Sequence, residues 1–352
     1  RKDLIPGKWF YLREGALFFR ETILPKLTHK LEEYAEIKFG LKTGANKFFH
    51  MKDIGHLYEL DYLSDPKKFE NWGVNAKTKA ELNKQGLIYI ENEGGEKFIL
   101  DRKDVTPLVR SPTELKSYTV RKLCSLVFKP DPPEKPGACS KRYIKWGENL
   151  VIEIEKGTSK GKKTRGYNSL STTKAHRPFW FNVPNLEPAP IISFKFVGMR
   201  HFLPISSTPV LADHTCDLIY PKKNLKKSLW VYLNSTIFYL TKELYGLRMG
   251  GGGAVLQLLT GEYSELPCFN ISNIKVSDGA SKILKREPLP ISEELEKSDR
   301  RNLDLMVLRS MGFENPERTF DELYKAFLIT VEDRLIKAAH PSRKPRRMET
   351  KL

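Results

Sequence analysis

Apolar residues recur three or four positions apart in four stretches of the chain, which is the spacing of one helix face. The four stretches are residues 15–34, 230–247, 301–311 and 319–339. Pro25 lies inside the first stretch, and a proline in a helix interior removes a hydrogen bond and clashes with the preceding turn. The pattern therefore predicts four helices, the first of them kinked at Pro25.

Between these stretches lie short runs of β-branched and aromatic residues, separated by connectors rich in proline and glycine. The runs are residues 87–91, 97–100, 120–128, 150–155 and 191–197. Runs of this length and composition are typical of strands. Because the strands come in succession and most helices follow them, the order favours an α+β fold over a doubly wound parallel sheet. We expect twisted mixed or antiparallel β-sheets with bracing helices, and a small C-terminal helical domain.

The same reading divides the chain into five parts. They are a helical lead-in (residues 1–35), a β-rich main domain (36–281), a linker rich in proline and charge (282–300), a helical C-terminal domain (301–340) and a basic tail expected to be disordered (341–352). The sequence starts at Arg1, with no initiator methionine and no apolar signal segment. We interpret this start as a cut inside a longer protein.

Composition excludes several classes of protein. The hydrophobic fraction of 40% is that of a globular chain, and no apolar run approaches the ~20 residues of a membrane helix. The four cysteines, Cys124, Cys139, Cys216 and Cys268, are far apart and form no CxxC pair. They predict neither a disulfide framework nor a zinc site, so we expect a cytoplasmic protein with no membrane partner.

The formal net charge of +17 is concentrated in one segment of the chain. Residues 111–230 carry 21 basic and 9 acidic side chains, and seven Lys or Arg lie within residues 156–177. A clustered basic stretch is typical of proteins that bind a polyanion such as nucleic acid. The alternative is a solvated lysine-rich surface. Aromatic residues near the cluster, including Tyr167 and Trp180, favour nucleic acid.

A search for catalytic motifs finds no nucleophile elbow, metalloprotease helix, phosphate-binding loop or dinucleotide fingerprint. His214 and Cys216 are two residues apart, and we interpret them as packing neighbours rather than metal ligands. Residues 131–134 read Asp-Pro-Pro-Glu, which resembles the loop that holds a flipped base in amino-methyltransferases. That loop needs an aromatic residue where Glu134 stands, so we interpret it as a surface turn.

Two segments carry a resemblance to a known family. The first, residues 39–49, reads Phe-Gly-Leu-Lys-Thr-Gly-Ala-Asn-Lys-Phe-Phe, and the second extends from Leu233 through four glycines at 250–253 to Pro267. Together they resemble the C-terminal, target-recognising half of adenine-N6 DNA methyltransferases of restriction–modification systems. The similarity is to the gamma-class enzymes and to the type IIG enzymes, in which restriction and methylation are fused. Intervening pieces at 107–111, 143–148 and 177–180 fit as well.

The resemblance implies a DNA target-recognition domain, with double-stranded DNA and the protein's own catalytic methyltransferase domain as partners. In that family an N-terminal domain binds S-adenosylmethionine and carries the catalytic loop. This sequence contains neither, so the cofactor is expected in a missing upstream domain. We assign no catalytic, cofactor-binding or metal-binding residue to this chain.

The residue types of both motifs suit contacts with a DNA backbone. Glycine permits positive φ and close approach to a phosphate, hydroxyl and amide groups can donate to phosphate oxygens, and lysines neutralise them. The candidate DNA-binding residues are Lys42, Thr43, Gly44, Asn46, Lys47, Lys160, Lys162, Lys163, Arg165, Arg248, Gly251 and Gly252. A tight structural turn at 40–46 and a flexible helix end at 250–253 are the alternatives. Phe48, Phe49 and Trp146 are expected in the core rather than stacked on bases.

Two other function classes stay open. One is a specificity subunit that docks a separate catalytic partner through the helices at 300–340. The other is an RNA-binding protein, although no RNA-recognition signature is visible.

Overall fold

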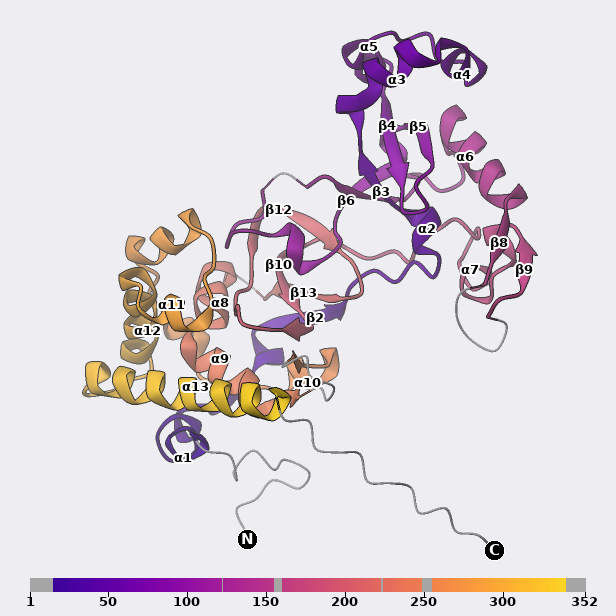
Figure 1. Cartoon of the computed structure of the whole chain (residues 1–352). Coiled ribbons are helices and arrows are strands. Elements are labelled where there is room, and N and C mark those ends of the chain that lie inside the picture. The colour runs from indigo at the N-terminus through magenta and orange to yellow at the C-terminus, as the bar shows by residue number, and fades with distance from the viewer. Residues whose placement is uncertain (1–14, 122, 155–159, 223, 249–254, 340–352) are drawn as a thin grey trace, which may run out of the picture.

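Figure 1 shows two lobes joined by one continuous sheet in the computed structural model, which describes residues 15–121, 123–154, 160–222, 224–248 and 255–339. The sheet has nine strands in the order β2-β13-β10-β12-β6-β7-β3-β4-β5. Their bounds are β2 (Ala35–Phe39), β3 (His50–Asp53), β4 (Leu87–Asn92), β5 (Lys97–Asp101), β6 (Val105–Val109), β7 (Ser125–Phe128), β10 (Ala189–Phe194), β12 (Ile205–Ala212) and β13 (Cys216–Pro221).

The two halves of this sheet meet at its one parallel pair of described neighbouring strands, β6 and β12. Leu108 lies opposite Leu211, and Val109 opposite Ala212. Every other neighbouring pair in the sheet is antiparallel. The sheet is therefore mixed, and the α+β fold predicted from the sequence is confirmed. We call the line where β6 and β12 pair the seam.

Three smaller sheets flank the large one. They are β1 (His29–Lys30) with β16 (Pro267–Cys268), β8 (Val151–Glu153) with β9 (Lys163–Arg165), and β14 (Leu247–Arg248) with β15 (Leu256–Gln257) and β11 (Phe196–Val197). The pair β8–β9 forms a hairpin on the lobe opposite the C-terminal helices (Figure 1).

The larger lobe is built around a single hydrophobic core. Ile191 and Leu218 of the sheet pack with Leu240 of α9, Leu303 of α12 and Leu323 of α13. The helices are α8 (Lys226–Leu233), α9 (Thr236–Tyr245), α10 (Thr260–Ser264), α11 (Ile291–Leu295), α12 (Ser298–Ser310) and α13 (Pro316–Ala339). The two helices predicted after residue 300 are confirmed, and they share this core with the sheet.

The smaller lobe has two cores, one on each side of its half of the sheet. The first core contains Phe48, Phe128 and Tyr143, and the second contains Tyr58, Phe69 and Tyr89. The helices are α2 (Asn46–Phe49), α3 (Tyr58–Ser64), α4 (Pro66–Asn71), α5 (Lys79–Lys84), α6 (Ala138–Asn149) and α7 (Ser171–Lys174). Phe48 and Phe49 are fully buried, so their predicted place in the core is confirmed.

Two predicted helices differ from the structure. The stretch 15–34 is not one helix. It begins with α1 (Ala16–Phe18), which continues through a π-helical turn (Phe19–Ile23) into a 3-10 turn (Leu24–Lys26), and a separate 3-10 turn (Leu31–Glu33) follows β1. The chain leaves the helix at Leu27, with ψ of 75°. Pro25 thus coincides with the end of the helix rather than with a kink inside it.

The stretch 230–247 is two helices, not one. Asn234 ends α8, and its side chain bonds the backbone N–H and C=O of Leu203 at 2.9 and 3.0 Å. Ser235 then caps α9, because its hydroxyl accepts from the N–H of Phe238. The helical periodicity of the sequence continues through residues 234 and 235. The contact of Asn234 with Leu203 and the new cap at Ser235 nevertheless interrupt the helix there.

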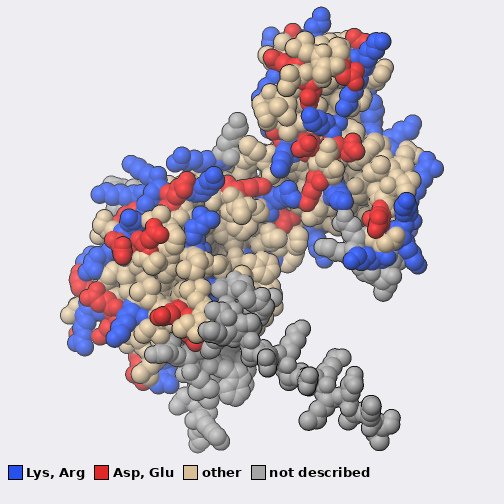
Figure 2. All heavy atoms as spheres, in the orientation of Figure 1, with Lys and Arg blue, Asp and Glu red and all other residues tan. Residues whose placement is uncertain are grey.

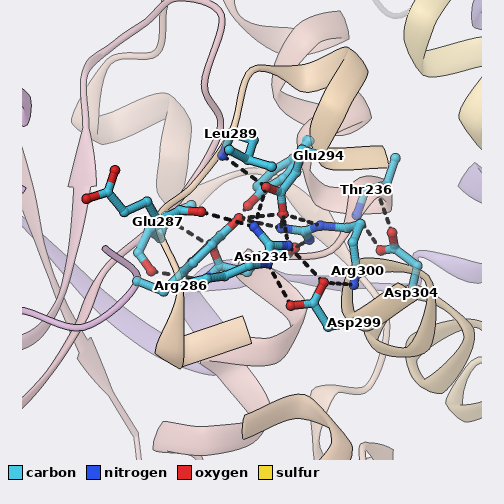
Figure 3. A network of polar contacts seen from close by, with 12 residues as sticks. Asn234, Thr236, Arg286, Glu287, Leu289, Glu294, Asp299, Arg300 and Asp304 are labelled. Carbon is cyan, nitrogen blue, oxygen red and sulfur yellow. Dashed lines mark hydrogen bonds and ion pairs between the residues drawn. The ribbon is translucent and has the colours of Figure 1, made fainter. Parts of the chain in front are cut away.

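The segment predicted as a linker, 282–300, contains α11 and a buried polar network (Figure 3). Glu294 accepts hydrogen bonds from Arg286 at 2.7 Å and from Arg300 at 3.0 Å. Arg300, fully buried, also donates to the hydroxyl of Tyr118 and to the backbone oxygen of Asn234. Glu294 and Arg300 of the segment thus point inward and connect α11 and α12 to the end of α8.

This network predicts a specific loss of stability in acid. Burial raises the pKa of Glu294, but Arg286 and Arg300 outweigh it and lower that pKa to about 2. A depressed carboxyl pKa contributes stability above the unfolded value and loses it as pH falls through the folded value. Between about pH 4.5 and pH 2, wild type should lose about 3 kcal/mol more than Glu294→Gln, measured as free energy of unfolding in denaturant. Parallel pH curves for the two chains would contradict the assigned charge of Glu294.

Across the described ranges, no helix is both long and apolar enough to cross a membrane.

Candidate nucleic-acid interface

Backbone hydrogen bonds hold the glycine-containing turn at residues 40–46 against the end of β12, next to the seam. The N–H of Leu41 donates to the carbonyl of Ala212 at 2.7 Å, and the N–H of His214 donates to the carbonyl of Leu41 at 3.0 Å. A Cβ at Gly40 would lie 2.2 Å from the carbonyl oxygen of Asp213. Glycine at 40 thus permits the close approach that brings the turn against the β12–β13 connection.

Within the turn, Thr43 and Asn46 form a pair. Thr43 is 1% exposed, and its hydroxyl donates to Oδ1 of Asn46 at 2.7 Å. The single proton of the hydroxyl is used in this bond, so in this structure Thr43 holds Asn46. Asn46 itself is exposed, as are Lys42 and Lys47. The bond at Oδ1 leaves the amide N–H groups of Asn46 available as donors.

Gly44 connects the turn to α7. Its φ is +72°, as expected for glycine in a tight turn, and a Cβ there would lie 2.7 Å from Cβ of Thr172. The hydroxyl of Thr172 donates to the carbonyl of Gly44 at 2.8 Å. The turn and the helix that follows the β8–β9 hairpin are therefore in direct contact.

Gly44→Ala is expected to destabilise the fold more than Gly86→Ala. Both glycines have φ near +70°, but a Cβ at Gly86 meets nothing within 4 Å. A non-glycine residue at positive φ costs about 1–2 kcal/mol at either site, and overpacking against Thr172 adds about 1–3 kcal/mol at Gly44 alone. Denaturant unfolding of both variants measures the difference. Equal losses would mean that Thr172 moves aside freely.

A pocket of about 670 Å³ opens beside the turn, at the C-terminal ends of β6 and β12. Its lining comes from α2, β3, β7 and the connections after β6 and β12. The lining residues are Asn46, His50, Lys52, Arg110, Ser111, Thr113, Glu114, Leu123, Cys124, Ser125, Asp213, His214 and Thr215. We call it the seam pocket.

Ionisable groups cluster around His50, which lines the seam pocket. His50 is 2% exposed and lies between Asp213, 3.5 Å from Nε2, and Glu93, 3.4 Å from Nδ1. Among the described residues, neither ring nitrogen has a hydrogen-bond partner. Burial lowers the pKa of His50, although both carboxylates act in the opposite direction. His50 is therefore a neutral, unsatisfied polar group at neutral pH.

Both carboxylates beside His50 have a second partner at the pocket. Arg110 pairs with Glu93 at 2.5 Å, and Nδ1 of His214 lies 3.0 Å from Asp213. Glu114 accepts from the hydroxyl of Ser125 at 2.5 Å and from the N–H of Arg110 at 3.2 Å. These bonds fix the positions of the charged groups before any ligand arrives.

Four further candidate residues lie on the β8–β9 hairpin, away from the turn at 40–46. They are Lys160, Lys162, Lys163 and Arg165. All four side chains are exposed. Within the described part of the chain, none of them is in an ion pair with an acidic residue, and Arg165 donates to the amide oxygen of Asn149. Figure 2 shows Lys and Arg gathered along the margin of the lobe that carries this hairpin. We call these four residues the basic hairpin.

Arg248 is not near the other candidates. It lies on β14, and its guanidinium pairs with Asp333 and donates to the carbonyl of Thr330 at 3.0 Å, both on α13. These contacts direct Arg248 into the C-terminal helix. Gly251 and Gly252 lie outside the described residues.

Sequence reasoning missed most of the seam pocket. Lys52, Arg110 and Glu114 were not among the candidates, and His214 had been interpreted as a packing neighbour. The available signal was that polar residues follow the apolar ends of two strands, at 110–111 and 213–215. Nothing in the sequence showed that these two strands pair in parallel. Among the described residues, no group of His, Cys, Asp or Glu is arranged to hold a metal ion.

Comparison with known proteins gives a fold likeness. No protein-family model matches the sequence, and no curated protein matches it. The chain is similar in structure to the type IIG restriction endonuclease BpuSI, with a TM-score of 0.57 and 10% sequence identity. The match covers 92% of this chain and 33% of BpuSI. The chain therefore shares the fold of about one third of a type IIG restriction endonuclease.

Proposed function

We propose that this chain binds duplex DNA sequence-specifically, as the target-recognition part of an adenine-specific DNA methyltransferase of a restriction–modification system. The observation that carries the proposal is the basic hairpin, four exposed cations without acidic partners among the described residues. It is joined through α7 to the turn at 40–46. The likeness to BpuSI, described as a type IIG restriction endonuclease, supports the same role.

The basic hairpin suits contact with phosphates. Long, exposed cationic side chains neutralise the backbone and release its counterions, which makes binding depend steeply on salt. Such contacts position a protein on the duplex without reading its sequence. Lys42 of the turn and Lys47 of α2 are exposed on the same lobe and would add to the positive field.

The proposed partner within the parent protein is a catalytic methyltransferase domain. That domain would bind S-adenosylmethionine and methylate the adenine, while this chain holds the duplex in register. Support for this division is that the chain matches only 33% of the length of BpuSI. The proposed assignment to the gamma class rests on the motifs at residues 39–49 and 233–267.

Titration of labelled nucleic acids into the chain tests the proposal. Duplex DNA should bind more tightly than an RNA hairpin of the same sequence, with an affinity that falls as salt rises from about 50 to 200 mM. Tighter binding of RNA would favour an RNA-binding protein. Absence of binding to any duplex at the lowest salt would refute DNA recognition by this chain.

A further inference from the structure

We propose that the seam pocket receives the edge of a base pair rather than a phosphate, and that Lys52 and Asn46 determine which base is accepted. This inference rests on the proposed binding of duplex DNA. It assigns a different task to each of the two sites: the basic hairpin holds the backbone, and the seam pocket reads sequence.

Charge is the first argument. The pocket lining carries two cations, Lys52 and Arg110, and two carboxylates, Glu114 and Asp213. A third carboxylate, Glu93, is not part of the lining but pairs with Arg110. The formal charges of these five side chains sum to −1, so a phosphate entering the pocket gains no net attraction from them. An uncharged base edge needs no such attraction. By contrast, no acidic side chain of the described residues pairs with the basic hairpin.

The mixture of donors and acceptors is the second argument. Lys52 and the amide of Asn46 present donors, while the carboxylate of Glu114 presents acceptors. Base edges in the major groove differ in their pattern of donors and acceptors, so a site with both kinds can discriminate among them. A phosphate offers acceptors alone and leaves Glu114 without a partner from the ligand.

Preorganisation is the third argument. Thr43 fixes the amide of Asn46 through the 2.7 Å bond to Oδ1. Ser125 and the N–H of Arg110 hold Glu114. His50 is on the same strand as Lys52 and two residues before it, so both side chains face the pocket.

Lys52 is the sharpest probe of the inference. Its side chain is exposed, and among the described residues it has no ion pair. Lysine favours guanine in the major groove, because O6 and N7 are adjacent acceptors. Lys52 should therefore impose a preference for guanine at one position of the recognised sequence.

The experiment is selection from a randomised duplex library by the full 352-residue chain and by Lys52→Met, Asn46→Ala and Lys162→Met. Lys52→Met should lose the preference at one position and bind the wild-type sequence about five- to a hundredfold more weakly, with the salt slope unchanged. Asn46→Ala should relax one position in the same way. Lys162→Met, the matched control on the basic hairpin, should keep the preference and lose about 0.9 from the salt slope.

Two results would overturn the inference. If Lys52→Met weakens every duplex alike and lowers the salt slope by about 0.9, the seam pocket holds a phosphate. If Lys52→Met and Asn46→Ala both select the wild-type sequence with wild-type affinity, the pocket does not touch DNA. In both cases duplex binding itself persists, so the proposed function survives. Loss of all duplex binding by the wild-type chain is the separate result that would remove both.

Discussion

Neutralising all four cations of the basic hairpin by glutamine is expected to weaken binding to every duplex by on the order of a hundredfold or more. The reason is that each lost phosphate contact removes about 0.9 from the slope of log affinity against log salt, so four contacts remove about 3.6. The side chains are exposed and outside ion pairs of the described chain, so the fold should be unaffected. Titration across a salt series measures the loss of affinity and the change in slope, and a thermal melt shows whether the fold is unaffected.

A matched control is available at the far end of the same lobe. Lys67, Lys77, Lys79 and Lys84 are also exposed, on and around α4 and α5. Glutamine at these four positions changes the net charge by the same amount. It should leave the salt slope within about one unit of wild type, because the α4–α5 tip lies away from the hairpin. If both quadruple variants lose affinity equally, net charge rather than the hairpin accounts for binding.

Glu294→Gln is expected to cost about 3–5 kcal/mol of folding stability, although it changes only one oxygen into an amide nitrogen. Glu294 accepts from Arg286 and Arg300, and Arg300 has no exposed surface (Figure 3). Removing the carboxylate leaves a buried guanidinium beside a second arginine without their shared counter-charge. That loss is far greater than a surface substitution gives.

Glu296→Gln, two residues after Glu294, separates charge from burial. Glu296 is exposed and immediately follows α11, so the same chemical change should alter the free energy of unfolding by less than about 0.5 kcal/mol. Denaturant unfolding of both variants makes the comparison. A loss below about 1 kcal/mol for Glu294→Gln would mean that Asp299 and Asp304 neutralise the two arginines without it.

Local patterns predicted some of the elements, because the causes of those elements are local. Helical periodicity after residue 300 and β-branched runs such as 87–91 correspond to α12, α13 and β4. The predictions failed where a distant group decides the structure. Asn234 ends α8 by bonding to Leu203, 31 positions away in sequence, and no spacing within residues 230–247 reveals that contact.

The candidate site divides in the same way. Positive φ at Gly44 follows from a glycine in a turn and was predicted. The partner of the Thr43 hydroxyl was not, because a threonine beside lysines suits a phosphate as well as it suits Asn46. The seam pocket joins Arg110 to Asp213, about a hundred residues apart, through the parallel pairing of β6 and β12. Pairing over such a separation leaves no periodic trace in the sequence.

The most direct measurement of the central claim is the enrichment of sequences from a randomised duplex library by the wild-type chain. Recognition of a DNA target predicts that repeated selection converges on one short motif, and that a duplex with this motif binds at least about a thousandfold more tightly than an unrelated duplex. Tight, salt-dependent binding with no enriched motif would contradict the account, because the chain would then hold the DNA backbone without reading its sequence.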